Sequence, residues 1–256
     1  NLLTWQLFRR KIRFYLLIMI KKNAAILFSL SFILPYNLKS DTFNLNDKFY
    51  LGFGAGILMP EDVDIKKAEA GIVNGVNISA NLAGTFKFDN GYQLSGILGY
   101  RYNEFFSLES EIAYSNFDYD QVNITVAGTA TSGGTTFTGT ANRSYEVDGS
   151  ISAFSMIFGP SVDIDIVENL ELIVGGGIGF TNHNDEVKSI GGSSGFAYDE
   201  DFTNFTTKFK TGLNYSLSSV SYIQAEYGYN FIDSGIENYS DDFTAHSLAG
   251  RLVFNF

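Results

Sequence analysis

The last thirteen residues, 244–256, read TAHSLAGRLVFNF and alternate between apolar and polar or small side chains. Successive side chains of a β-strand point to opposite faces, so the residues of one face can be read directly. One face carries Leu248, Gly250, Leu252, Phe254 and Phe256. The other face carries Arg251, with Val253 as its one large apolar residue. An apolar face that runs to the final residue, opposite a face that holds a charge, favours a closed barrel in lipid over a soluble sheet.

The same two-residue period recurs in seven earlier segments of the chain. The expected strands are 49–57, 92–102, 107–115, 148–162, 170–180, 205–216 and 223–231. No segment with a helical period follows residue 40. Together with the terminal stretch, the pattern predicts eight strands.

The connections between these strands alternate in length. Short turns are expected at 103–106, 167–169 and 217–221. Long loops are expected at 59–90, 120–147, 185–202 and 234–243. An even strand count, with short turns at one rim and long loops at the other, is typical of outer-membrane barrels. The predicted fold class is therefore all-β, an eight-stranded antiparallel transmembrane β-barrel.

The front of the chain has the layout of a secretory signal peptide. In residues 19–40, Lys21 and Lys22 precede an apolar run at 24–34, and small polar residues then lead to a cleavage site after Ser40. The apolar run is shorter than the roughly 20 residues that a spanning helix needs. We expect three parts: an upstream, non-native extension (1–18), a signal peptide (19–40) and the barrel (41–256). The alternative is an uncleaved amphipathic anchor in the inner membrane, built from residues 9–20.

Charge is distributed unevenly and limits the classes of partner. Seven of the 17 basic residues lie within the first 40 positions, and all 28 acidic residues follow them, so residues 41–256 carry a formal net charge of −18. Such a charge repels nucleic acid, which we exclude as a partner. The absence of cysteine excludes a disulfide framework or a thiolate metal site.

Charge placement also indicates which face of the strands points outwards. A soluble eight-stranded barrel would have its apolar face inside, but 24 Phe and 15 Tyr would overfill so narrow a lumen. With the aromatic face in lipid, the charges on the polar faces point inwards and need partners. The predicted lumen network consists of Arg101, Glu109, Glu111, Glu171, Lys208, Lys210, Glu226 and Arg251. Two neighbouring pairs, Glu226 with Arg251 and Arg101 with Glu109, lie at similar heights on adjacent strands.

Three segments carry a resemblance to a known group: 88–114 (FDNGYQLSGILGYRYNEFFSLESEIAY), 212–229 (GLNYSLSSVSYIQAEYGY) and the terminal SLAGRLVFNF. Over residues 47–256 the chain resembles the small eight-stranded OmpA-like and opacity-type surface proteins of the Gram-negative outer membrane. The resemblance implies insertion by the outer-membrane assembly machinery, which reads an aromatic-ended terminal strand. The residues matching that signal are Leu248, Leu252, Phe254 and Phe256.

Candidate chemistry is sparse. Some barrels of this size modify lipid A with a rim histidine and serine, but His246 and Ser247 are adjacent and so point to opposite faces. His183, the other histidine, is also expected near the long-loop rim. Glycines at 52–56 and 174–180 lack the helix of a phosphate-binding loop and are interpreted as relieving crowding in a curved wall.

Acidic loop residues offer a possible cation site among lipopolysaccharide phosphates, but a solvated loop is the preferred interpretation. These residues are Asp199, Glu200, Asp201, Asp241 and Asp242. The Thr- and Gly-rich tract 127–140 is predicted to be a mobile surface loop. No catalytic residue, metal or cofactor is expected.

These observations predict a monomeric outer-membrane surface protein with a structural or surface-binding role, in contact with lipid and lipopolysaccharide. Its long loops would face a host or environmental ligand that the sequence does not identify. Two alternatives stay open: a small diffusion pore and a lipid A-modifying enzyme at the rim. Single-channel conductance separates the pore from the binding role.

Overall fold

The computed structural model describes residues 48–73, 76–233 and 242–256. The expected extension, the signal peptide and its cleavage site lie outside the described residues, as do residues 234–241 of the last long connection.

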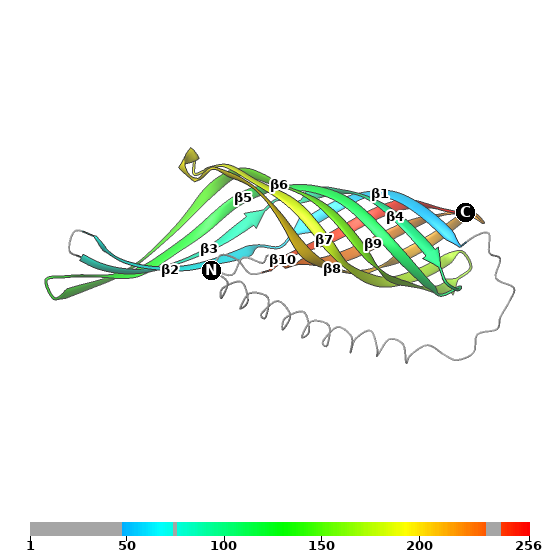
Figure 1. The fold of residues 1–256 in the computed structure, drawn as a ribbon, viewed down its shortest axis with the longest axis horizontal. Helices are drawn as coiled ribbons and strands as arrows, with labels where there is room; N and C mark the ends of the chain where they lie inside the picture. Colours follow the sequence, from blue (N-terminus) through cyan, green and yellow to red (C-terminus); the bar gives the residue numbers. More distant parts are fainter. Residues whose placement is uncertain (1–47, 74–75, 234–241) are drawn as a thin grey trace, which may run out of the picture. The chain divides into compact units, whose positions relative to one another are not determined.

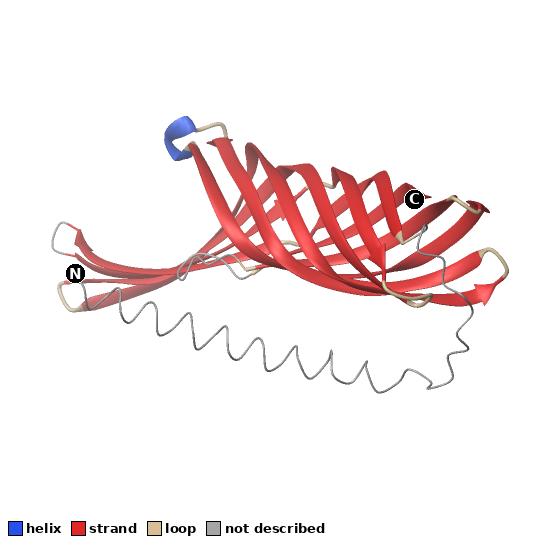
Figure 2. Cartoon of the chain, turned by 45° about the vertical axis from the view of Figure 1, so that its right-hand side comes forward, coloured by secondary structure: helices blue, strands red, loops and turns tan. Residues whose placement is uncertain are grey.

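Eight strands form a closed antiparallel ring, as the alternation predicted (Figure 1). They are β1 (Phe49–Pro60), β4 (Gly91–Arg101), β5 (Phe106–Ser132), β6 (Thr135–Val167), β7 (Leu170–Ile190), β8 (Tyr198–Ser218), β9 (Ser221–Ile232) and β10 (Phe243–Asn255). Each strand pairs with the next in this order, and β10 pairs with β1 to close the ring. The strands run obliquely around the ring, as closure of a narrow barrel requires (Figure 2).

Two further strands occupy the connection that was expected to be a long loop at 59–90. Strand β2 (Val63–Val73) pairs with β3 (Val76–Phe88), and β3 then pairs with the far half of β5. Along β5, strand β4 pairs only with the half that follows the short turn, from Ser107 to Asn116. The β2–β3 hairpin therefore continues the sheet beside β5 where β4 has ended.

The tract 127–140, expected to be a mobile loop, forms regular strand instead. Strands β5 and β6 pair as far as Ser132 and Thr135, and the turn between them is Gly133–Gly134, with φ of +58° and +82°. Positive φ at both central residues is the geometry of a two-residue hairpin turn that suits glycine. The frequent threonines of this tract are β-branched and favour strand.

The connection expected at 185–202 is shortened in the same way. Strand β7 continues to Ile190 and pairs with β8 from Val187 opposite Tyr198, so only a short segment with a 3₁₀ turn, η2 (Ser194–Phe196), joins them. The first three of the four expected long connections are thus mostly strand.

The outward face of the ring is apolar over a band of limited height. Leu248, Leu252 and Phe254 of β10 are between 41% and 51% exposed, whereas Arg251 and Val253 between them are buried inside. Phe180 of β7 and Phe205 of β8 are paired on the outward face. The next outward-facing pair towards the long connections, Asn182 opposite Thr203, is polar. The apolar surface therefore ends at this level, as the lipid-facing surface of a membrane barrel does.

Aromatic side chains lie at both edges of this band. At the short-turn end, Phe49 packs on Tyr100 and on Phe256, with ring centroids 5.1 and 6.3 Å apart. At the other end, Tyr92 lies 6.3 Å from Tyr114. Aromatic girdles at both interfaces are characteristic of outer-membrane barrels. No helix among the described residues is long and apolar enough to cross a membrane.

Candidate functional site

A network of charged side chains crosses the interior of the ring. Its centre is Glu226 of β9, whose carboxylate contacts three cations. The distances are 2.9 Å to Lys208 Nζ, 2.5 Å to Arg251 Nη1 and 3.6 Å to Lys210 Nζ. All four side chains are no more than 5% exposed, so the network is buried away from bulk solvent.

Two carboxylates on β5 complete the network from the opposite wall. Glu111 accepts hydrogen bonds of 2.7 and 2.8 Å from Lys208 Nζ and lies 3.2 Å from Arg251 Nη2. Glu109 pairs with Lys210 and accepts a hydrogen bond of 2.7 Å from the Tyr50 hydroxyl. Three carboxylates therefore face three cations, and the network, which we call the plug, is neutral.

Polar neighbours hold the plug in place. The Arg251 guanidinium donates to Ser95 Oγ at 3.0 Å and to Gln224 Oε1 at 2.9 Å, and Gln224 in turn donates to Asn214 at 3.2 Å. These partners were not among the predicted network residues, although Gln224 lies on the same polar face as Glu226. Hydrogen bonds to the remaining polar atoms are what make a buried ionic cluster tolerable.

Glycines on the inner wall make room for the long side chains of the plug. A Cβ at Gly54 would lie 2.3 Å from Arg251 Cγ, and one at Gly228 would lie 2.9 Å from Lys208 Cε. The glycines of 52–56 thus have a packing role in the wall, as the sequence indicated.

The structure brings six of the eight predicted lumen charges together and places the other two nearer the short-turn end. Arg101 lies over the rings of Tyr50 and Tyr222, at 5.1 and 5.6 Å, rather than beside its expected partner Glu109. Glu171 accepts a hydrogen bond of 3.4 Å from Asn214. Arg101 lies opposite Ser107 in the strand register, which explains why it and Glu109 do not form a direct cross-strand pair.

An apolar cluster closes the lumen on the short-turn side of the plug. Tyr50, Ile97, Tyr222 and Val253 are all buried and pack together. Val253, the apolar residue on an otherwise polar face, is fully buried in this cluster. Its departure from the alternation is therefore explained by packing inside the barrel.

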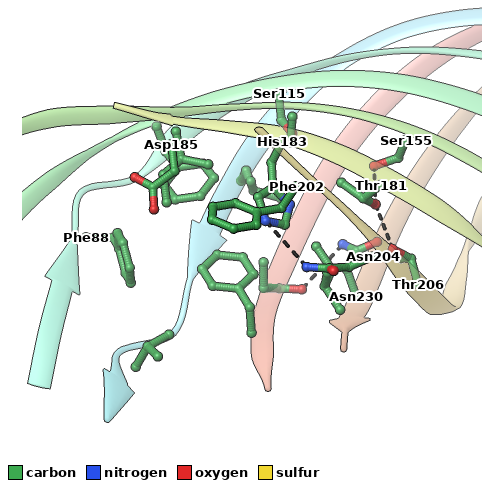
Figure 3. Close-up of a pocket in the computed structure, with 18 of the residues that line it drawn as sticks. Phe88, Ser115, Ser155, Thr181, His183, Asp185, Phe202, Asn204, Thr206 and Asn230 are labelled. Carbon is green, nitrogen blue, oxygen red and sulfur yellow. Dashed lines mark hydrogen bonds between the residues drawn. The ribbon is translucent and has the colours of Figure 1, made fainter. Parts of the chain in front are cut away.

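A cavity of about 720 Å³ lies on the other side of the plug, towards the long connections. Its floor is polar: Ser155, Thr181 and Thr206 are linked by hydrogen bonds of 2.8 and 2.7 Å, and Asn204 lies 3.5 Å from His183 (Figure 3). Burial lowers the pKa of His183, so its ring is neutral at neutral pH. The upper walls come from β2, β3 and the extended parts of β5, β7 and β8, which the sequence analysis treated as loops.

His246 lies on the outside of the wall and Ser247 on the inside, as the alternation predicted. The Nε2 atom of His246 is 2.9 Å from Glu61 Oε1, and its Nδ1 atom is 2.6 Å from the Tyr227 hydroxyl. Thr244 donates a hydrogen bond to Glu61, and these contacts lower the pKa of Glu61. Both ring nitrogens of His246 are thus engaged by groups other than a serine.

The acidic residues weighed as a cation site are dispersed. Asp199 and Asp201 both accept hydrogen bonds from Asn184, at 2.7 and 3.2 Å, on the outer face of β8. Glu200 points to the other face and lines the cavity. Among the described residues, no cluster of His, Cys, Asp and Glu has a geometry that could hold a metal ion. Asp241 lies outside the described residues.

Comparison with known proteins gives structural likeness only. No protein-family model matches the chain, and no curated protein matches it. Neisserial surface protein A is 14% identical, with a TM-score of 0.46 over 81% of this chain and 97% of that one. OprG of Pseudomonas aeruginosa is 12% identical, with a TM-score of 0.46 over 82% and 96%. The third is a structure of Ail, the attachment invasion locus protein of Yersinia pestis, in complex with a heparin analogue. Ail is 16% identical, with a TM-score of 0.39 over 82% of this chain and 99% of that one.

The decisive observations come from the chain itself: a closed ring of eight strands, an apolar outer band between aromatic girdles, and charges buried within. The chain is an eight-stranded outer-membrane β-barrel. This architecture is the one that the resemblance to OmpA-like and opacity-type proteins implied. The plug lies across its interior, and the cavity lies between the plug and the long connections.

Proposed function

We propose that this outer-membrane barrel is a non-conducting surface protein that binds partners through its extracellular strand extensions. The observation that carries the proposal is the plug, in which six buried charges from β5, β8, β9 and β10 contact one another across the lumen. The lumen of an eight-stranded barrel is already narrow enough for side chains to fill. An ion crossing it would have to separate these buried pairs, which is costly in a dry interior.

The extensions supply the binding surface. Long connections of outer-membrane barrels face the cell exterior, and here β2, β3 and the far halves of β5 and β6 form a sheet beyond the apolar band. Every residue from Thr135 to Glu146 of β6 is exposed. An ordered sheet that projects from the barrel presents its side chains without the entropy cost of ordering a loop.

Single-channel recording tests the closed lumen. We expect the purified protein, inserted in planar lipid bilayers, to give no stable conductance steps, because the plug seals the path. A large porin inserted in the same membranes serves as the positive control for insertion and recording. Reproducible steps from the wild-type protein would instead support the diffusion pore.

Removal of the distal hairpin tests the binding role. We expect cells displaying a variant in which residues 123–144 are replaced by two glycines to lose adhesion to host or environmental surfaces that wild-type-displaying cells bind. The barrel should still fold, because the deleted segment lies beyond the paired region of β4 and β5. Adhesion equal to wild type, with the variant present at the surface, would contradict a binding role for this sheet.

A further inference from the structure

The cavity above the plug has the size and the lining of a small-molecule site. Its volume of about 720 Å³ falls within the roughly 300–1,000 Å³ of ligand pockets. Seven aromatic residues line it: Phe86, Phe88, Phe117, Tyr119, Tyr198, Phe202 and Phe243. Phe88 is central among them, with ring centroids 5.0 Å from Tyr119, 5.6 Å from Phe117 and 5.7 Å from Phe243.

Among the side chains that the structure describes, the charged groups of the cavity are of one sign: Asp185 and Glu200 line it, and no lysine or arginine does. Asp185 Oδ1 accepts a hydrogen bond of 2.7 Å from the Tyr119 hydroxyl, and its Oδ2 accepts one of 3.1 Å from the Tyr198 hydroxyl. Each carboxylate oxygen has capacity for a further donor. A partly buried carboxylate that is held by neutral partners favours a cation beside it.

A second polar group on the cavity wall independently indicates a ligand that donates hydrogen bonds. Gln93 of β4 is 6% exposed, and its Oε1 atom has no hydrogen-bond partner among the described residues. A buried acceptor left unpaired costs free energy that a bound donor would recover. Figure 3 shows Asp185 and Phe88 at one side of the cavity and the Ser155–Thr181–Thr206 row at the other.

We propose that this cavity binds a small hydrophobic amine, an apolar or aromatic body that carries a protonated nitrogen. The aromatic lining packs against the body and attracts a cation through the faces of its rings. Asp185 pairs with the ammonium group, and Gln93 accepts from an N–H or O–H donor. Fatty acids, phosphates and other anions are disfavoured by Asp185 and Glu200. The inference rests on the proposed function only in that the plug closes the floor of the cavity.

Calorimetric titration with three matched probes tests the proposal on the purified full chain in detergent. The probes are 2-phenylethylamine, the neutral 2-phenylethanol and the anionic 3-phenylpropionate. We expect the amine to bind the wild type most tightly and the anion most weakly. Asp185→Asn should weaken amine binding about 10- to 100-fold, the range for loss of a hydrogen bond to a charged group, and leave alcohol binding within about 2-fold.

Matched variants separate this site from general effects of charge. Asp199 is an acidic residue on the outer face of β8, where it accepts a hydrogen bond from Asn184. Asp199→Asn should therefore leave the amine affinity within about 2-fold of the wild-type value. Phe88→Ala should weaken all three probes, because it removes lining shared by each. Retained heat-modifiable migration on gels verifies that each variant is folded.

The pH dependence provides a further readout. Burial raises the pKa of Asp185, so the folded protein protonates this group at a higher pH than the value of about 3.9 for an exposed aspartate. Amine affinity should therefore fall as the pH drops through that raised pKa, and Asp185→Asn should flatten this fall. The other titratable groups of the cavity are Tyr119, Tyr198, Glu200 and His183. His183→Gln should leave the fall in place if Asp185 causes it.

Three results would overturn the proposal. The first is equal affinity of the wild type for the amine and the alcohol. The second is amine binding that Asp185→Asn and Asp199→Asn change equally. The third is absence of amine binding at millimolar concentration. Conductance by the wild type would defeat the closed-lumen proposal while leaving these affinities as they are, so the two proposals fail separately.

Discussion

Replacing Glu226 with glutamine is expected to lower the free energy of unfolding of the barrel by about 3–5 kcal/mol. The carboxylate faces Lys208, Lys210 and Arg251, and glutamine has nearly the same shape but no charge. The variant leaves three buried cations against two carboxylates. Urea titration of the protein refolded in lipid vesicles, followed by the gel shift of the folded form, measures the loss.

Two controls identify the cause of that loss. Glu104→Gln removes an exposed acid in the short turn between β4 and β5 and should change stability by no more than about 0.5 kcal/mol. The double variant Glu226→Gln with Lys208→Gln restores charge balance and should recover part of the loss, since contacting residues are not additive. If Glu226→Gln costs no more than Glu104→Gln, the plug is hydrated and exposed ion pairs are the better description.

Replacing Phe53 with arginine is expected to cost about 2–4 kcal/mol, the range for a basic residue at the lipid-facing midplane of a barrel. Phe53 is 59% exposed and lies midway along the outward residues of β1, opposite Leu252 of β10. Its surroundings would be water in a soluble barrel and hydrocarbon in a membrane barrel. The same vesicle-based unfolding titration distinguishes the two.

Phe137→Arg is the matched comparison for this substitution. Phe137 is 64% exposed on the distal part of β6, beyond the apolar band, and its replacement should change stability by no more than about 0.5 kcal/mol. Equal effects at Phe53 and Phe137 would contradict the assignment of the outer band to lipid.

The eight ring strands were predictable because two different solvents act on their two faces. Within the band, lipid selects apolar residues on one side and the lumen selects small or polar ones on the other, so the period of two is visible, as in β10. The distal part of β6 has water on both faces, since every residue of 135–146 is exposed. Without that contrast the alternation disappears, and the Thr- and Gly-rich tract was misinterpreted as a loop.

The sequence predicted which charged residues face the lumen better than it predicted which of them contact one another. Alternation placed Lys208 and Glu111 inside, but their contact joins strands that do not pair with each other, and it depends on the tilt and stagger of the whole ring. Arg101 shows the same limit, since it lies over Tyr50 and Tyr222. The cavity was missed because Tyr119 lay between the expected strand 107–115 and the expected loop 120–147, and Asp185 was assigned to a loop.

The closing of the ring by β1 and β10 sets the order in which this chain can fold. Tyr50 lies opposite Asn255, so the pair that seals the wall joins two strands far apart in the sequence. Contacts of such long sequence separation form slowly, and until β10 is in place both β1 and β9 present unpaired edges. Synthesis must therefore reach β10 before the first described strand acquires its second neighbour. For that whole interval the edges of the incomplete sheet are open to pairing with other chains.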